Sequence, residues 1–229
     1  MRRLPHAGRS TGQPRIRHLL GDPEARAIRV GAIPTMKTDA PEAMSATVDV
    51  LVEGRADDES VMSTVGLVRD ANTIIVIDPG MVHDRSQILK PLAALGVDPG
   101  QVTDIVLSHH HPDHTLNAAL FPNARVHDHW AIYDRDKWID RAADGVLITP
   151  SVRLIAAPGH SEQDIATLVG TADGVVAFTH AWWMSSGPAD DPYAQMDQLH
   201  VSRARILVVA HRIVPGHGAP FAPTVDTPR

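Results

Sequence analysis

Four histidines and one aspartate are concentrated in the six positions from His109 to His114, within the stretch LSHHHPDHT. His109 and His111 are two residues apart, so in an extended segment their imidazoles point to the same side and reach one metal ion at about 2.0–2.1 Å. Pro112 ends the extended run. Asp113 and His114 then face elsewhere, which favours a second metal close to the first. The pattern therefore predicts a metal site.

Two Pro-Gly-His turns supply further ligands of the same chemical type. His160 lies in APGHS and His217 lies in VPGHG, near the C-terminus. Together with the histidine loop they provide six ligands, three for each metal, which leaves a position open for water, as in catalytic rather than structural sites. His110 is not expected to bind metal. The sequence contains no cysteine, so nitrogen and oxygen must supply every ligand.

Apolar runs of strand length must position these residues. Two batches of strands, each followed by helices, predict two sheets packed face to face with helices outside. The predicted strands are 46–54, 61–69, 73–78, 102–108, 124–130, 152–159, 164–170 and 174–180, the predicted helices are 84–97 and 114–122, and 191–218 is predicted as a helix followed by a short strand and turn.

Three residues near the predicted ligands are expected to support them. Gly159 and Gly216 precede His160 and His217, and are expected to permit the turns because glycine tolerates positive φ. Asp78, in the turn sequence DPG, is expected to hold the loops under the site by hydrogen bonding.

Length and composition indicate one globular domain. The chain has 229 residues, of which 43% are hydrophobic, and no stretch approaches the roughly 20 apolar residues of a membrane span. The whole chain carries a charge of −6, with +4 in residues 1–43 and −10 in the remainder. An acidic body is a poor platform for nucleic acid. We therefore expect a cytoplasmic protein without a membrane partner that acts on a small molecule, and a homodimer is the ordinary expectation.

The opening stretch MRRLPHAGRSTGQPRIRHLLGDPEARA has no helical or strand periodicity, and the first alternating strand pattern follows Met44. Residues 1–43 are therefore set apart from the rest of the chain. They are predicted to be a flexible extension, so that the folded domain spans 44–229 and survives their deletion. A transit peptide is one alternative. A start codon assigned too far upstream, with Met44 as the true beginning, is another.

The segments SHHHPDH, APGHS and PGHG, in this order and at these separations, resemble the metallo-β-lactamase superfamily over roughly residues 46–222. The segments LFPNARVHDH and APGHSEQDIATLVG are most similar to the subgroup of metallo-β-lactamase domain-containing protein 1. The resemblance implies an α/β fold, a four-layer αββα sandwich, and a family of mostly dizinc hydrolases with some iron-dependent oxygenases. It assigns His109, His111 and His160 to the first metal, and Asp113, His114 and His217 to the second.

One departure concerns the aspartate that usually bridges the two metals in this family. The chain reads VAFTHAWW, with Thr179 and His180 at the usual Gly-Asp positions. A neutral imidazole has one lone pair to offer, so His180 is predicted to bind one metal or none. The lost anionic charge weakens the second site. We therefore expect one or two Zn²⁺ per chain, the first bound firmly and the second weakly, with iron as the alternative metal.

These features favour a metal-dependent hydrolase. Metal-bound hydroxide would attack an ester, lactone, thioester or amide, with Asp113 orienting it and passing a proton to the leaving group. The alternatives are a nuclease that cleaves phosphodiesters, and a mononuclear iron oxygenase or catalytically altered binding protein. Trp182 and Trp183 directly follow the site strand, and at least one of them is predicted to line the substrate pocket.

Overall fold

The structure of the protein is a computed structural model that describes residues 46–229. The predictions for residues 1–43 lie outside the described residues. The first sheet has seven strands, in which β5, β6 and β7 run parallel to one another and the other pairs are antiparallel. In the order of pairing, the strands are β1 (Thr47–Val52), β4 (Val65–Asp70), β5 (Thr73–Ile77), β6 (Asp104–Val106), β7 (Arg125–His127), β8 (Ala131–Asp134) and β9 (Lys137–Asp140).

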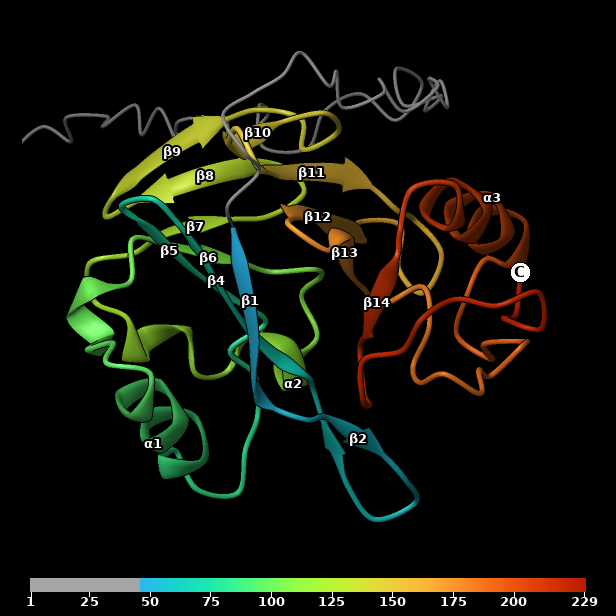
Figure 1. Ribbon diagram of the computed structural model, residues 1–229, viewed down its shortest axis with the longest axis horizontal. Coiled ribbons are helices and arrows are strands. Elements are labelled where there is room, and N and C mark those ends of the chain that lie inside the picture. The colour runs from blue at the N-terminus through green and yellow to red at the C-terminus, as the bar shows by residue number, and fades with distance from the viewer. Residues whose placement is uncertain (1–45) are drawn as a thin grey trace, which may run out of the picture. The chain divides into compact units, whose positions relative to one another are not determined.

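The second sheet has five strands that pair in sequence order. All its pairs are antiparallel except β13 with β14, which are parallel. A short hairpin of β2 (Arg55–Ala56) and β3 (Val61–Met62) stands apart from both sheets and lies next to the short helix α2 (Pro112–Thr115) (Figure 1). The five strands are β10 (Leu147–Thr149), β11 (Val152–Ala156), β12 (Ile165–Thr171), β13 (Gly174–Thr179) and β14 (Arg212–Pro215).

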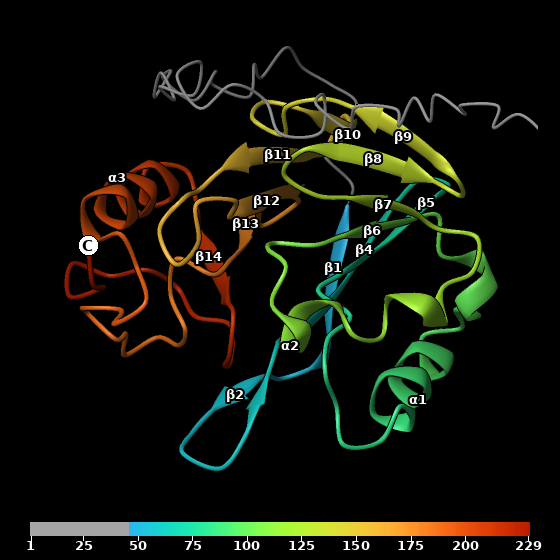
Figure 2. The same ribbon diagram turned by 180° about the vertical axis from the view of Figure 1, so that it is seen from behind.

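Helices lie on the outer side of each sheet. In both ribbon views α1 and α3 are on opposite sides of the paired sheets (Figures 1 and 2). None of the helices in residues 46–229 is long and apolar enough to cross a membrane. The helices are α1 (Ser86–Ala94), α2 (Pro112–Thr115) and α3 (Met196–Leu207), with 3₁₀ turns at Pro99–Gln101 and Ala118–Leu120.

Two apolar layers result from the alternation of side chains along the first sheet. In β5, Ile75 and Ile77 belong to the layer between the sheets, whereas Val76 belongs to the layer shared with α1. The inner layer also contains Val68, Val106, Leu154, Ile165, Val169, Phe178 and Val214. The outer layer also contains Leu67, Ile105, Ile88 and Leu92, the last two being one helical turn apart in α1. The predicted αββα sandwich is confirmed.

Two predicted elements are interrupted where the chain makes long-range hydrogen bonds. The segment 114–122 is not one helix, because α2 begins earlier and ends at Thr115, and the backbone N–H of Asn117 donates to a carbonyl in the turn after β5, 2.8 Å away. The strand 61–69 is divided into β3 and β4. Between them the backbone N–H of Thr64 donates to the carbonyl of Gly216 at 2.7 Å. The strands β8, β9 and β10 were not predicted.

Candidate metal centre

The seven residues predicted as metal ligands come together where strands of both sheets end. The loops that follow four strands supply histidines, and α2 supplies the two ligands of the PDH segment. His109 and His111 follow β6, Asp113 and His114 lie in α2, His160 follows β11, His180 follows β13, and His217 follows β14. Within each of the two predicted triads, the ligand atoms lie within 4.8 Å of one another.

The first triad has the spacing of a metal site. Nε2 of His109 lies 3.0 Å from Nδ1 of His111, and Nε2 of His160 lies 3.1 Å from that same Nδ1. A tetrahedral zinc site with bonds of about 2.0–2.1 Å has ligand–ligand distances of about 3.3 Å. Burial and the neighbouring imidazoles lower the pKa of His109 and of His111. Both imidazoles are therefore neutral at neutral pH, which is the form that binds metal.

Asp191 orients the third ligand of this triad, and no sequence pattern pointed to it. Nδ1 of His160 donates to Asp191 at 2.9 Å, so its Nε2 faces the other two ligands. The same carboxylate accepts the indole N–H of Trp183 at 2.8 Å and the backbone N–H of Tyr193 at 2.9 Å. Burial opposes ionisation of Asp191, but these hydrogen bonds outweigh it and lower its pKa. Asp191 thus connects a candidate ligand with an aromatic wall.

Replacing Asp191 by asparagine should weaken the first metal site by about 10–100-fold, as the loss of a carboxylate behind a ligating histidine typically does. The Kd for zinc, measured by competition with a chromogenic chelator, tests this. Asp190→Asn is the matched control, because Asp190 is exposed beside it in the chain. An unchanged Kd in Asp191→Asn would show that His160 needs no such support.

The second triad is anchored from behind in the same way. Nδ1 of His217 donates to the carbonyl of Met62 at 3.0 Å, and Nδ1 of His114 donates to Asp78 at 2.9 Å. Nε2 of each ring then faces Oδ2 of Asp113, at 3.7 Å for His217 and 3.3 Å for His114. Asp78 also accepts the backbone N–H that precedes His109, at 2.7 Å, which confirms that it holds the loops under the site.

The carboxylates around His114 determine the charges of this triad before metal arrives. Burial opposes protonation of His114, but Asp78 and Asp113 outweigh it and raise its pKa to about 9. Burial also opposes ionisation of Asp113, yet its hydrogen bond to His114 outweighs that effect and lowers the pKa of Asp113. Burial and the charge of His114 lower the pKa of His217 to about 4. A divalent cation would replace the proton of His114 as the partner of Asp113.

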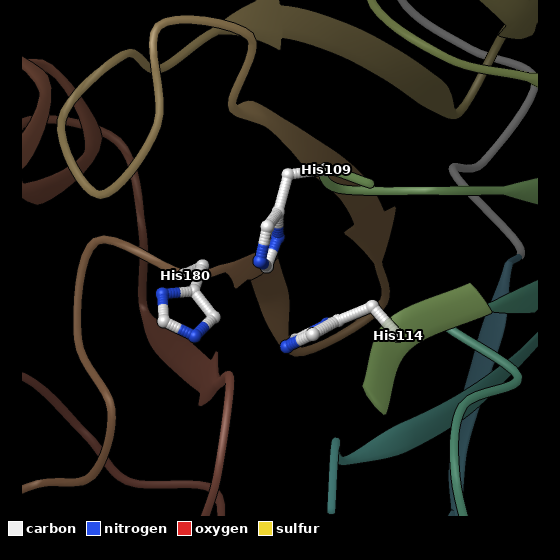
Figure 3. A group of neighbouring side chains, drawn as sticks. All are labelled: His109, His114 and His180. Carbon is white, nitrogen blue, oxygen red and sulfur yellow. The ribbon is translucent and has the colours of Figure 1, made fainter. Parts of the chain in front are cut away.

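His180 lies between the two triads. Its ligand nitrogen is within 4.8 Å of those of His109 and His114, and the three rings converge in Figure 3. Nε2 of His180 is 2.9 Å from Nε2 of His217, the candidate ligand of the second triad. Its Nδ1 is buried and has no hydrogen-bond partner among the described residues. Burial and the nearby imidazoles lower the pKa of His180, so its ring is neutral and suited to binding a cation.

The donor set therefore fits divalent metal ions. The first triad offers three imidazole nitrogens, and the second offers two nitrogens and a carboxylate oxygen, with His180 beside both. Nitrogen and oxygen donors in this arrangement suit zinc and also iron. The assignment of each ligand to one metal stays a prediction.

Gly159 and Gly216 are required for a reason other than the one predicted. Neither has a positive φ. A Cβ on Gly159 would lie 2.7 Å from Cδ1 of Leu199 in α3, and a Cβ on Gly216 would lie 2.5 Å from Cδ2 of His180. These positions therefore need glycine because other parts of the chain approach them closely.

The substitution Gly216→Ala should displace the His180 ring and destabilise the fold by about 1–3 kcal/mol, the usual cost of overpacking. Thermal unfolding of Gly216→Ala and of the double variant Gly216→Ala/His180→Ala measures this. Removing the ring should restore most of the lost stability, because the two positions are in direct contact. Gly218→Ala is the control, because its Cβ would have no contact shorter than 3.1 Å, to Cβ of Met184, and would not approach the His180 ring. Equal destabilisation by Gly216→Ala with and without the His180 ring would contradict the proposed clash.

A cavity of about 420 Å³ opens over the triads. Apart from candidate ligands it is lined by Ala56, Val61, Trp183 and Tyr193. Trp182 does not line it, which corrects the prediction for this residue. Its side chain is fully buried, its indole N–H donates to the carbonyl of Pro228 at 2.8 Å, and the guanidinium of Arg203 lies over its ring. Of the two tryptophans, Trp183 is the one beside the candidate metal centre.

Comparison with known proteins identifies similar sequences. Residues 59–217 match the family model of the metallo-beta-lactamase superfamily. The metallo-beta-lactamase domain-containing protein 1 of Xenopus laevis is 32% identical over 193 residues, which are 76% of this chain and 81% of that protein. Its human counterpart is 36% identical over 160 residues, which are 64% of this chain and 59% of the human protein.

An enzyme and a solved structure are also similar. The hydroxyacylglutathione hydrolase of Aeromonas salmonicida is 37% identical over 112 residues, which are 44% of this chain and 41% of the enzyme. A metallo-beta-lactamase-type crystal structure from Thermotoga maritima superimposes with a TM-score of 0.65 at 22% identity, covering 78% of this chain and all of that one. The last likeness concerns the fold alone. By family model and by sequence, the chain belongs to the metallo-beta-lactamase superfamily.

Proposed function

We propose that the protein is a metal-dependent hydrolase that cleaves an ester, lactone, thioester or amide. The observation that carries the proposal is the convergence of the two triads at the floor of one cavity, with Asp113 among the residues that line it. The chain is similar over part of its length to a hydroxyacylglutathione hydrolase, whose name describes the hydrolysis of an acyl compound. This similarity supports the same chemistry.

The residues of the chain divide the work of hydrolysis between them. A bound divalent metal would act as a Lewis acid on the reacting oxygen and lower the pKa of a water molecule. Asp113, whose lowered pKa keeps it ionised, accepts a proton from the attacking water and returns it to the leaving group. Asp191 holds His160 in one orientation, so that its Nε2 stays directed at the other two ligands of the first triad. Trp183 and Tyr193 form a wall that limits the access of bulk water.

A panel of chromogenic substrates tests the proposal. The metal-loaded full chain is incubated with a lactone, a thioester, a cephalosporin and bis-nitrophenyl phosphate, with chelator-treated protein as the control. We expect metal-dependent cleavage of at least one of the three carbonyl substrates. Cleavage of the phosphodiester alone would favour the nuclease, and a metal-bound protein that cleaves nothing would favour the altered binding protein. Either result would overturn the proposal.

Elemental analysis of the purified protein distinguishes zinc from iron.

A further inference from the structure

The walls of the cavity carry no positive charge among the described residues. Beyond the candidate ligands, the lining side chains are two small aliphatic residues, Ala56 and Val61, and two aromatic residues, Trp183 and Tyr193. A bound metal would interact with the reacting carbonyl group. A carboxylate or phosphate elsewhere in the substrate would therefore lie against walls that offer it no cation, which makes its desolvation costly.

The hairpin that supplies Ala56 and Val61 to the cavity is negatively charged at its turn. Ala56 and Val61 line the cavity, and the turn between them carries the exposed side chains of Asp57, Asp58 and Glu59. The backbone N–H groups of Glu59 and Ser60 donate to Asp57 and lower its pKa, so this carboxylate is ionised at neutral pH. Arg55 offsets one of the three charges, and its side chain is hydrogen-bonded to Ser60 at 2.8 Å. The hairpin turn therefore has net negative charge. Its acidic side chains line a neighbouring hollow with Met81 and His83 rather than the cavity itself, so they act on an approaching anion over a distance, within about a Debye length.

Another part of the cavity wall is aromatic and close to the candidate metal centre. The ring planes of Trp183 and Tyr193 are 5° apart, with centroids 6.1 Å apart. The Trp183 ring is 6.0 Å from that of the ligand candidate His160. Tyr193 is 72% exposed, so its face is available to a bound molecule. Flat aromatic faces bind apolar groups with little loss of side-chain entropy.

On these grounds we propose that the substrate is an uncharged ester or lactone whose apolar part lies against Trp183 and Tyr193. Anionic acyl compounds and phosphodiesters are discriminated against. This inference rests on the proposed hydrolase function. In the reaction one water is consumed, the acyl C–O bond breaks, the hydroxyl joins the acyl carbon, and a proton goes to the departing alkoxide. The carboxylic acid formed from the neutral substrate releases its proton to solvent at neutral pH, and the negatively charged hairpin turn repels the resulting carboxylate.

Three nitrophenyl esters of matched length test the charge preference. They are the neutral butyrate, the anionic hemisuccinate, and an ester with a terminal trimethylammonium group, each corrected for its own rate with hydroxide. For the metal-loaded full chain we expect kcat/KM for the butyrate to exceed that for the hemisuccinate at least tenfold, with the cationic ester not disfavoured. Raising the ionic strength should narrow the difference, because exposed charges are screened.

The variant Val61→Arg tests whether charge at the cavity rim determines the preference between anionic and neutral esters. Val61 is 39% exposed at the rim, so an arginine fits there without burial. It should raise the hemisuccinate-to-butyrate ratio of kcat/KM about tenfold, mainly through KM. Val201→Arg, on the exposed side of α3, is the control and should leave the ratio unchanged. Equal or faster cleavage of the hemisuccinate by the natural chain would overturn this inference, as would a ratio insensitive to Val61→Arg. Failure to cleave any ester or lactone would instead count against the hydrolase function itself.

Discussion

Asp113→Asn lowers kcat for the hydrolytic reaction by about 10²–10⁴-fold, the range expected when a positioned general base is removed. Asparagine keeps the shape of the side chain but cannot accept a proton. Asp113 has no substitute in position among the described residues. Asp78 and Asp191 accept hydrogen bonds from the rear nitrogens of His114 and His160. Asp164 lies behind His109, 3.8 Å from its Nδ1, and accepts hydrogen bonds from Ser161. The rate should fall while the first triad keeps its metal.

The measurement must separate lost catalysis from lost metal. Steady-state kinetics with the best substrate of the panel gives kcat, and metal analysis of the same sample gives occupancy. Asp136→Asn provides the control, because Asp136 is exposed in the turn between β8 and β9. A variant with full occupancy and undiminished kcat would exclude Asp113 as the proton acceptor. A variant that lost the metal of the first triad would show that the two triads are not independent.

The histidine cluster could be predicted from the sequence because its information is local. The spacing of His109, His111 and His114 determines the side to which each imidazole points once a strand precedes them. That strand is recognisable in the sequence as an apolar run. The Pro-Gly-His turns are equally short patterns. The structure brings these segments together by pairing β13 with β14 and packing the two sheets, which the alternation of apolar residues also indicated.

Asp191 could not be predicted, because its role depends on distant parts of the chain. It lies in the loop between β13 and α3, in the sequence ADDPY, where no periodicity gives a side chain a direction. The neighbouring Asp190 has the same local signal and is exposed. Only the folded arrangement shows which carboxylate meets Nδ1 of His160.

The missed strands are short and poorly patterned. All four residues of β9 are exposed, including Trp138 and Ile139, so apolar alternation does not distinguish a buried face from a solvent face. β10 has three residues, with Leu147 half exposed. Such edge strands form because an existing strand offers hydrogen bonds, which is a property of the sheet rather than of the segment.

His180 changes the charge of the centre more than its geometry. In the two triads and the position between them, Asp113 is the one carboxylate, and two divalent cations would bring four positive charges. The neutral ring of His180 contributes a nitrogen near His217 but no charge. Repulsion between two metals is therefore less compensated than with a bridging carboxylate. We therefore expect a firmly bound first metal and a weaker second one.

His180→Asp should therefore raise the affinity for the second zinc by about 100-fold or more. At about 4 Å and an effective dielectric near 20, two opposite unit charges attract by about 4 kcal/mol. A hundredfold change in Kd corresponds to about 2.7 kcal/mol, which leaves room for the desolvation of the new carboxylate. Calorimetric titration of metal-free protein should show two unequal steps for the natural chain and two similar steps for the variant. His180→Asn, which keeps the size of the new side chain without its charge, should leave the second step weak. Two equally tight zinc ions in the natural chain would mean that an imidazole at this position compensates charge as well as a carboxylate does.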